Sequence, residues 1–196
     1  GEVVRGGRAI GGTALQALAA LQEVSLTREP VLATACQVLK MPLRDFVDVP
    51  EKTARLLDEA KRRWEQRDGM SLVERRKAWE RLKTVERYHQ WSVLRVTPEE
   101  LEGRYFLEEV YALRIGEAGI VGLPGEFFTQ FGLRIKAAAP FPVTIPVTIT
   151  NPGFNYHPPE AEYEEGGHEL TACMLEPGSS ERIVAAALEL AARIAK

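Results

Sequence analysis

The side chains best suited to metal chemistry gather between Gly122 and Glu169, in a stretch that reads GLPGEFFTQFGLRIKAAAPFPVTIPVTITNPGFNYHPPEAEYEEGGHE. Glu126 stands at the expected start of a helix, directly after the turn GLPG. Tyr156 lies in a Pro- and Gly-rich loop that follows the next expected strand. A metallohydrolase can use both oxygen donors, but a catalytic zinc usually has three protein ligands. The pair therefore predicts part of a metal site, and the chain alone predicts an incomplete enzyme.

The same residues also have interpretations that need no ligand. A glutamate in the first turn of a helix is stabilised by the helix dipole alone. His157 and His168 add imidazole donors to the loop, but His157 stands before two prolines and can equally belong to a rigid turn. The chain contains no Ser-His-Asp pattern, nucleophile elbow, Gly-rich phosphate loop or HExxH motif.

The order of the expected elements predicts an α/β fold, with a mixed sheet flanked by helices and an inserted, charged helical hairpin at about residues 50–91. Ligands of such sheets gather beyond the carboxyl ends of strands. If the strands before Glu126 and before the Tyr156 loop are parallel, both side chains lie on one rim.

From hydrophobic spacing and turn signals, we expect a helix at 6–24, strands at 31–42, 104–115 and 118–123, a helix from Glu126 to Ala139, a strand at 143–150 buried on both faces, a short strand near 169–175, and a C-terminal helix capped by Ser179 or Ser180.

The helical hairpin carries 12 Lys and Arg residues against 8 Asp and Glu residues. Its second helix should begin with a capping box formed by Ser71 and Glu74. One interpretation is a basic, aromatic-rich surface for an acidic partner. The other, which we favour, is a solvated amphipathic hairpin that packs on Trp64 and Trp79, because charges of both signs interleave along it.

The composition is that of an ordinary globular protein, with 196 residues, 45% apolar residues and a net charge of −3. This balance gives no reason to expect nucleic acid as a partner. Cys36 and Cys173 have no CxxC spacing, so we expect two buried thiols. The lack of a disulfide framework slightly favours the cytoplasm over secretion. The chain begins at Gly1 without an apolar leader, so we also expect a processed or truncated start and treat residues 1–196 as a single domain or the C-terminal portion of a larger catalytic domain.

The motifs GLPGEFFTQFGLRIKAAAPF and Y-x-P-x-x-x-x-Y-E-E-G-G-x-E resemble the C-terminal half of the catalytic domain of the neutral/alkaline (non-lysosomal) ceramidase family. The resemblance covers roughly residues 100–195 and extends more loosely to 6–42, but not to the helical hairpin. It implies zinc-assisted hydrolysis of an N-acyl amide, with Glu126 and Tyr156 as two zinc ligands. Two histidines, a serine and an arginine would come from the N-terminal half of the same protein or from a partner chain.

Two departures from the family pattern concern the substrate more than the fold. His168 stands where the family has a second tyrosine near the reacting carbonyl, and Pro159 replaces a small polar residue. We therefore expect His168 as a catalytic hydrogen-bond donor to the oxyanion and His157 as a substrate contact, with an N-acyl lipid or another amide as substrate. A non-catalytic relative that acts as a binding or assembly module is the alternative, and a homo-oligomer is compatible with either.

Overall fold

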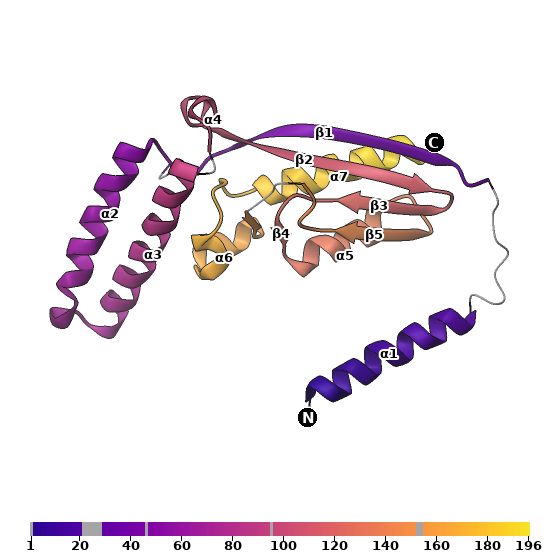
Figure 1. Ribbon diagram of the computed structural model, residues 1–196, viewed down its shortest axis with the longest axis horizontal. Coiled ribbons are helices and arrows are strands. Elements are labelled where there is room, and N and C mark those ends of the chain that lie inside the picture. The colour runs from indigo at the N-terminus through magenta and orange to yellow at the C-terminus, as the bar shows by residue number, and fades with distance from the viewer. Residues whose placement is uncertain (1, 21–28, 46, 95, 152–154) are drawn as a thin grey trace. The chain divides into compact units, whose positions relative to one another are not determined.

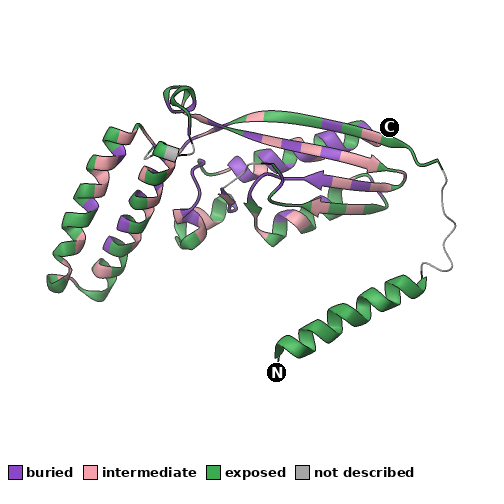
Figure 2. Cartoon of the chain, viewed as in Figure 1, coloured by how far each residue is buried: buried purple, intermediate pink, exposed green. Residues whose placement is uncertain are grey.

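The computed structural model describes residues 2–20, 29–45, 47–94, 96–151 and 155–196. The chain divides into two compact units, Gly1–Val31 and Leu32–Lys196. In the first unit, α1 (Glu2–Ala20) contains no buried residue and is exposed along its whole length (Figures 1 and 2). It starts earlier than the helix expected at 6–24, and residues 21–24 of that prediction lie outside the described residues.

The second unit is built on a four-stranded mixed sheet, which confirms the predicted α/β fold. The strands are β1 (Leu32–Pro42), β2 (Tyr105–Ile115), β3 (Ala118–Gly122) and β5 (Val143–Val147), and they lie side by side in that order (Figure 1). β1 and β2 are antiparallel, as are β2 and β3, whereas β3 and β5 are parallel. The parallel pair is the arrangement that brings the ends of two strands to one rim.

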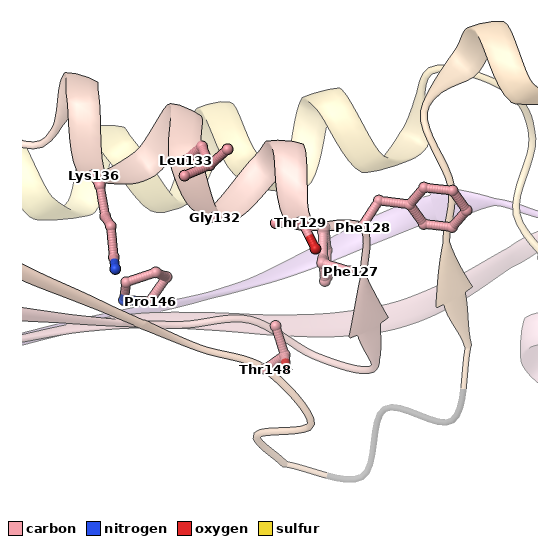
Figure 3. A pocket seen from close by; sticks show the side chains of 8 residues that line it. All are labelled: Phe127, Phe128, Thr129, Gly132, Leu133, Lys136, Pro146 and Thr148. Atoms are coloured by element: carbon pink, nitrogen blue, oxygen red, sulfur yellow. The ribbon is translucent and has the colours of Figure 1, made fainter. Parts of the chain in front are cut away.

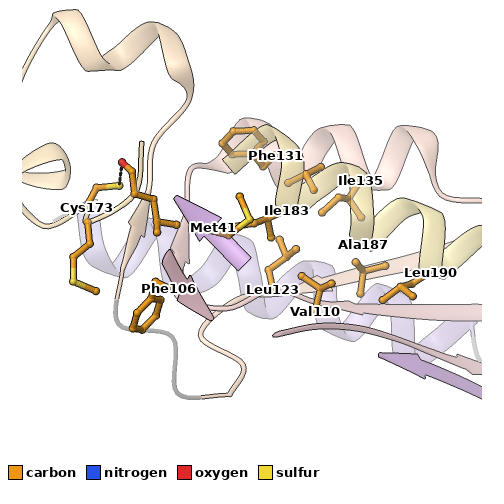
Figure 4. Close-up of a cluster of buried hydrophobic side chains, with 14 of the residues drawn as sticks. Met41, Phe106, Val110, Leu123, Phe131, Ile135, Cys173, Ile183, Ala187 and Leu190 are labelled. Atoms are coloured by element: carbon orange, nitrogen blue, oxygen red, sulfur yellow. Dashed lines mark hydrogen bonds between the residues drawn. The ribbon is translucent and has the colours of Figure 1, made fainter. Parts of the chain in front are cut away.

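The core lies on one face of this sheet, beneath α5 (Thr129–Ala138) and α7 (Ser179–Ile194). Side chains alternate between the two faces of a strand, and Phe106, Val110 and Ala112 of β2 all point into the core. α7 is Ala-rich and packs on β1, β2 and β3, with Ile183, Ala187 and Leu190 buried against the strands (Figure 4).

Within the second unit, the opposite face of the sheet is largely uncovered. Leu113, Ile120 and Ile145 are consecutive cross-strand partners on it, and each is exposed or half-buried. The prediction that strand 143–150 is buried on both faces is therefore wrong, because β5 is an edge strand whose Val143, Ile145 and Val147 are exposed. Cys36 is also exposed on this face, contrary to prediction, whereas Cys173 is buried.

The helical hairpin forms as predicted, from α2 (Pro50–Glu65) and α3 (Leu72–Leu94), joined by the 3₁₀ turn η2 (Arg67–Gly69). Ser71 and Glu74 form the expected capping box, with Glu74 Oε2 accepting from the Ser71 amide at 2.9 Å and Ser71 Oγ accepting from the Glu74 amide at 3.3 Å. Tyr88 of α3 joins the hairpin to the rest of the second unit, because its hydroxyl donates to the Cys173 carbonyl.

Two local predictions are corrected by the structure. The expected strand near 169–175 is instead the short helix α6 (His168–Thr171), followed by an isolated bridge between Leu43 and Leu175. The residue before α7 is Gly178, and no serine side chain caps this helix, because the Ser180 hydroxyl donates to the Pro158 carbonyl at 2.8 Å. α4 (Pro98–Gly103) and η3 (Glu160–Glu164) complete the fold. None of the described helices is long and apolar enough to cross a membrane.

Candidate functional site

Glu126 and Tyr156 are direct partners in the short parallel ladder that joins β4 (Glu126–Phe127) to β6 (Tyr156–His157). The ladder lies beyond the carboxyl ends of β3 and β5. The expected helix start at Glu126 is thus wrong, since the chain first forms β4 and α5 begins at Thr129. The predicted position of both residues on one rim agrees with the structure.

The turn before Glu126 places this ladder. Gly125 has a φ of +65°, a backbone conformation that favours glycine. A Cβ atom on Gly125 would lie 2.3 Å from the Asn155 carbonyl oxygen. This close approach allows the Glu126 amide to donate to the same oxygen at 2.8 Å. Gly125 therefore sets the separation of the two segments that carry the candidate ligands.

The Glu126 carboxylate lies close enough to the Tyr156 phenol to affect its ionisation. This interaction raises the pKa of the Tyr156 phenol, and burial and the charges of Glu126 and Glu169 raise it further. Tyr156 is half-buried and Glu126 is exposed. The raised pKa favours the protonated phenol beside this carboxylate.

An open pocket of about 260 Å³ lies over this pair. Its lining consists of Glu126, Phe127, Phe128, Thr129, Tyr156 and Glu169. His168 is exposed beside it, and its ring meets that of Tyr156 edge-on, with 5.6 Å between the centroids. The structure thus brings together Glu126, Tyr156 and His168, and it adds the carboxylate of Glu169.

His157 does not line this pocket. Successive side chains of β6 point to opposite sides, so His157 faces the core and is fully buried. Its ring stacks on that of Phe127, with centroids 4.1 Å apart. Its Nε2 atom lies 3.5 Å from Oε1 of Glu108, and neither ring nitrogen has a hydrogen-bond partner among the described residues. Burial lowers the pKa of His157 to about 3, so the ring is neutral.

Glu108 is a buried carboxyl group that sequence reasoning overlooked. It is 1% exposed, and Asn155 Nδ2 donates to its Oε1 at 3.1 Å. Burial raises the pKa of Glu108 to about 7. The alternation of side chains along β2 could have revealed this burial. Glu108 stands between Phe106 and Val110 in the set of residues that faces the core. Glu108, Asn155 and His157 thus form a polar cluster directly behind the ladder.

An apolar pocket of about 200 Å³ adjoins the first one. The two share Phe127, Phe128 and Thr129, and Pro146 and Lys136 lie at the end far from Phe128 (Figure 3). This second pocket lies between α5 and the edge strand β5. An apolar chain bound there would begin next to the Glu126–Tyr156 pair.

The donors present fit half of a zinc site. Zinc takes four ligands from carboxylate, imidazole and thiolate groups, with phenolate less usual. Glu126 and Tyr156 offer two oxygens on one wall of a pocket that is open to further donors. In the part of the chain that the structure describes, no group of three His, Cys, Asp or Glu side chains could by itself hold a metal ion.

Comparison with solved structures gives a structural similarity, whereas the sequence comparisons give none. The chain matches no known family model and no curated protein sequence. It is similar to a solved structure described as "Ceramidase complexed with C2", with a TM-score of 0.42 and 17% identity. The aligned part covers 51% of this chain and 20% of that one.

Proposed function

We propose that this chain is the C-terminal portion of a zinc-dependent, ceramidase-like amidohydrolase that cleaves an N-acyl amide bond. The observation that carries the proposal is the β4–β6 ladder. It pairs Glu126 with Tyr156, the two residues that the sequence resemblance marks as zinc ligands, and both line one open pocket. Neither residue is needed there for packing, because one is exposed and the other half-buried.

In this proposal the residues of the chain bind and orient. Glu126 and Tyr156 would hold the metal together with two histidines from upstream or from a partner chain. When bound, zinc supplies Lewis acidity toward the amide carbonyl and the attacking water. His168 would donate a hydrogen bond to the oxyanion. His157 would support the site from the core side, because its ring stacks on Phe127 and so holds the β4–β6 ladder in place.

The apolar pocket beside the pair supports an N-acyl substrate. Its wall of Phe127, Phe128, Leu133 and Pro146 suits an alkyl chain, whose burial is favourable in proportion to its area. The reacting amide would then lie over Tyr156.

The uncovered face of the sheet supports the proposal that the site is completed by another segment. A sheet face that stays in water normally carries polar side chains, whereas this one presents Leu32, Val38, Ile115 and Val143, each at least 43% exposed. Such a face is expected to be buried by another layer.

The test uses the complete native protein with Glu126→Gln and Tyr156→Phe variants. We expect both variants to lose bound zinc, measured by elemental analysis, and at least 100-fold in amide hydrolysis, because each removes one metal donor. Glu99→Gln and Tyr105→Phe are matched controls, since Tyr105 donates to Glu99 at 3.1 Å in a similar pair elsewhere on the surface. Full zinc occupancy and unchanged turnover in the Glu126 variant would refute the assignment.

The alternative function is that of a non-catalytic binding or assembly module. The same measurement of bound zinc distinguishes it from the hydrolase. The finding that favours it is the lack of a complete metal-binding group among the described residues. A native protein that contains neither zinc nor the upstream histidines would support it.

A further inference from the structure

The basic charge of the helical hairpin is concentrated at its free end. We call residues 61–77 the hairpin tip; they comprise the end of α2, η2 and the start of α3. The tip holds 7 Lys and Arg residues against 3 Asp and Glu residues, whereas the rest of the hairpin, 50–60 and 78–91, holds 5 of each. The whole surplus of positive charge in the hairpin therefore lies at the tip.

The cations of the tip are displayed to solvent. Lys61, Arg62, Arg63, Arg76 and Lys77 are all exposed, and Figure 2 shows the tip as mainly exposed surface. One of the three acidic side chains, Glu74, is held in the capping box by Ser71. The tip thus presents a positive surface on a molecule whose net charge is −3.

Large aliphatic side chains lie at the same place. Leu72 is 83% exposed and Val73 is 65% exposed, in the first turn of α3. The ring of Trp64 in the tip pairs with that of Trp79, two residues beyond the tip, with 5.1 Å between centroids. Arg67 stacks over Trp64 and Lys83 over Trp79, at 5.2 and 4.7 Å from the ring centroids. The tip therefore combines exposed apolar residues with a basic surround.

We propose that the hairpin tip binds the surface of a membrane rich in anionic lipids. Clusters of Lys and Arg are attracted to the negative surface potential of such membranes. Leu72 and Val73 would enter the boundary between headgroups and acyl chains, where apolar side chains flanked by basic ones are stable. Trp64 and Trp79 would lie at headgroup level, which aromatic rings prefer.

A bilayer fits this surface better than a nucleic acid does. Anionic membranes and nucleic acids both attract arginine, but a phosphate backbone makes no favourable contact with the exposed Leu72 and Val73. The pairing of the two tryptophans with one another also leaves their faces less available for stacking on bases. The proposal does not rest on the zinc chemistry, and its test uses neither metal nor substrate.

The test is sedimentation of the chain with vesicles of phosphatidylcholine, with and without phosphatidylserine. The tip variant combines Lys61→Gln, Arg62→Gln and Arg63→Gln. The control combines Arg55→Gln, Arg134→Gln and Arg182→Gln, which removes the same charge from exposed residues outside the tip. A third variant, Leu72→Ser with Val73→Ser, is compared with Val93→Ser, which is 55% exposed near the base of the hairpin.

We expect binding only to phosphatidylserine vesicles, and weaker binding as salt shortens the screening length. Three lost cations should reduce the affinity about 100-fold, at about 1 kcal/mol each. The Leu72/Val73 variant should lose roughly tenfold, and both controls should bind like the parent protein. No binding to anionic vesicles, equal binding to pure phosphatidylcholine, equal losses in tip and control variants, or binding to RNA but not to vesicles would each overturn the proposal. Circular dichroism verifies that every variant is folded.

Discussion

At the scale of single residues, Glu108 is the side chain whose ionisation should govern stability. Its carboxyl group is buried beside Asn155 and His157, and burial raises its pKa to about 7. In the unfolded chain the same group titrates at about 4.3. The folded protein therefore binds one more proton than the unfolded chain between these two values, and the contribution of Glu108 to stability falls as the pH rises through this window.

Replacing Glu108 with Gln should remove this dependence, because the amide keeps an oxygen for Asn155 but carries no charge at any pH. Relative to the parent protein, the variant should gain stability as the pH rises from about 4 to 7, by up to roughly 3 kcal/mol at about 1.4 kcal/mol per pKa unit. Denaturant unfolding at a series of pH values gives this difference directly. His157 makes the opposite contribution in both proteins, because its lowered pKa makes stability rise with pH between about 3 and 6.5.

Glu117→Gln provides the control for this series. Glu117 is exposed in the turn between β2 and β3, so its replacement should change stability only slightly. A flat difference for Glu108→Gln would mean that the buried carboxyl group is ionised in the folded protein.

At the scale of elements, the turn at Gly125 determines whether β4 and β6 can pair. Gly125→Ala would place a methyl group 2.3 Å from the Asn155 oxygen at a φ of +65°. We expect this variant to lose roughly 1–3 kcal/mol of stability, the usual cost of strain at such a position, and to bind zinc more weakly in the complete protein. Thermal unfolding and metal analysis measure the two effects.

Gly132→Ala is the matched comparison for this turn. Gly132 lies in α5, where an added Cβ would meet its nearest neighbour, Pro146 Cγ, at 3.8 Å. Alanine is the better helix former by about 1 kcal/mol, so this variant should be at least as stable as the parent protein. Equal behaviour of the two variants would show that the Gly125 turn does not control the ladder.

Local patterns predicted the elements better than their surroundings. The sequence predicts the helical hairpin and its capping box of Ser71 and Glu74 correctly, because caps and helical periodicity depend on residues that are neighbours in sequence. The adjacency of Glu126 and Tyr156 followed from parallel strands. The sequence does not predict the exposure of β5, because Val and Ile favour both central strands and edge strands. The strand predicted near residues 169–175 is wrong, because no short-range pattern in these residues distinguishes the single helical turn of α6 from a strand.

At the scale of the whole second unit, the uncovered sheet face is the surface through which the proposed catalytic domain would be completed. Ile145→Lys should leave the stability of the isolated chain nearly unchanged, because Ile145 is 47% exposed. It should weaken association with the remaining portion of the protein or with a partner chain, since a buried lysine must lose its hydration. Analytical ultracentrifugation of the native assembly measures this.

Val93→Lys is the control for the assembly experiment, because Val93 is 55% exposed on α3 and lies outside the sheet. Association that is unaffected by Ile145→Lys would mean that this face stays in water in the native protein.

The positions of the tryptophans have a practical consequence for optical work on this protein. All three, Trp64, Trp79 and Trp91, belong to the helical hairpin. Intrinsic fluorescence excited through indole will therefore follow the opening of α2 from α3 through Trp64 and Trp79. Trp91 packs against the hydrophobic core, so its emission will also respond to changes in that core. Because Trp64 and Trp79 are only 5.1 Å apart, their electronic transitions will also couple. The hairpin thus carries its own chromophore pair, and a melting curve recorded by fluorescence will combine the opening of the hairpin with the loss of the core contacts of Trp91.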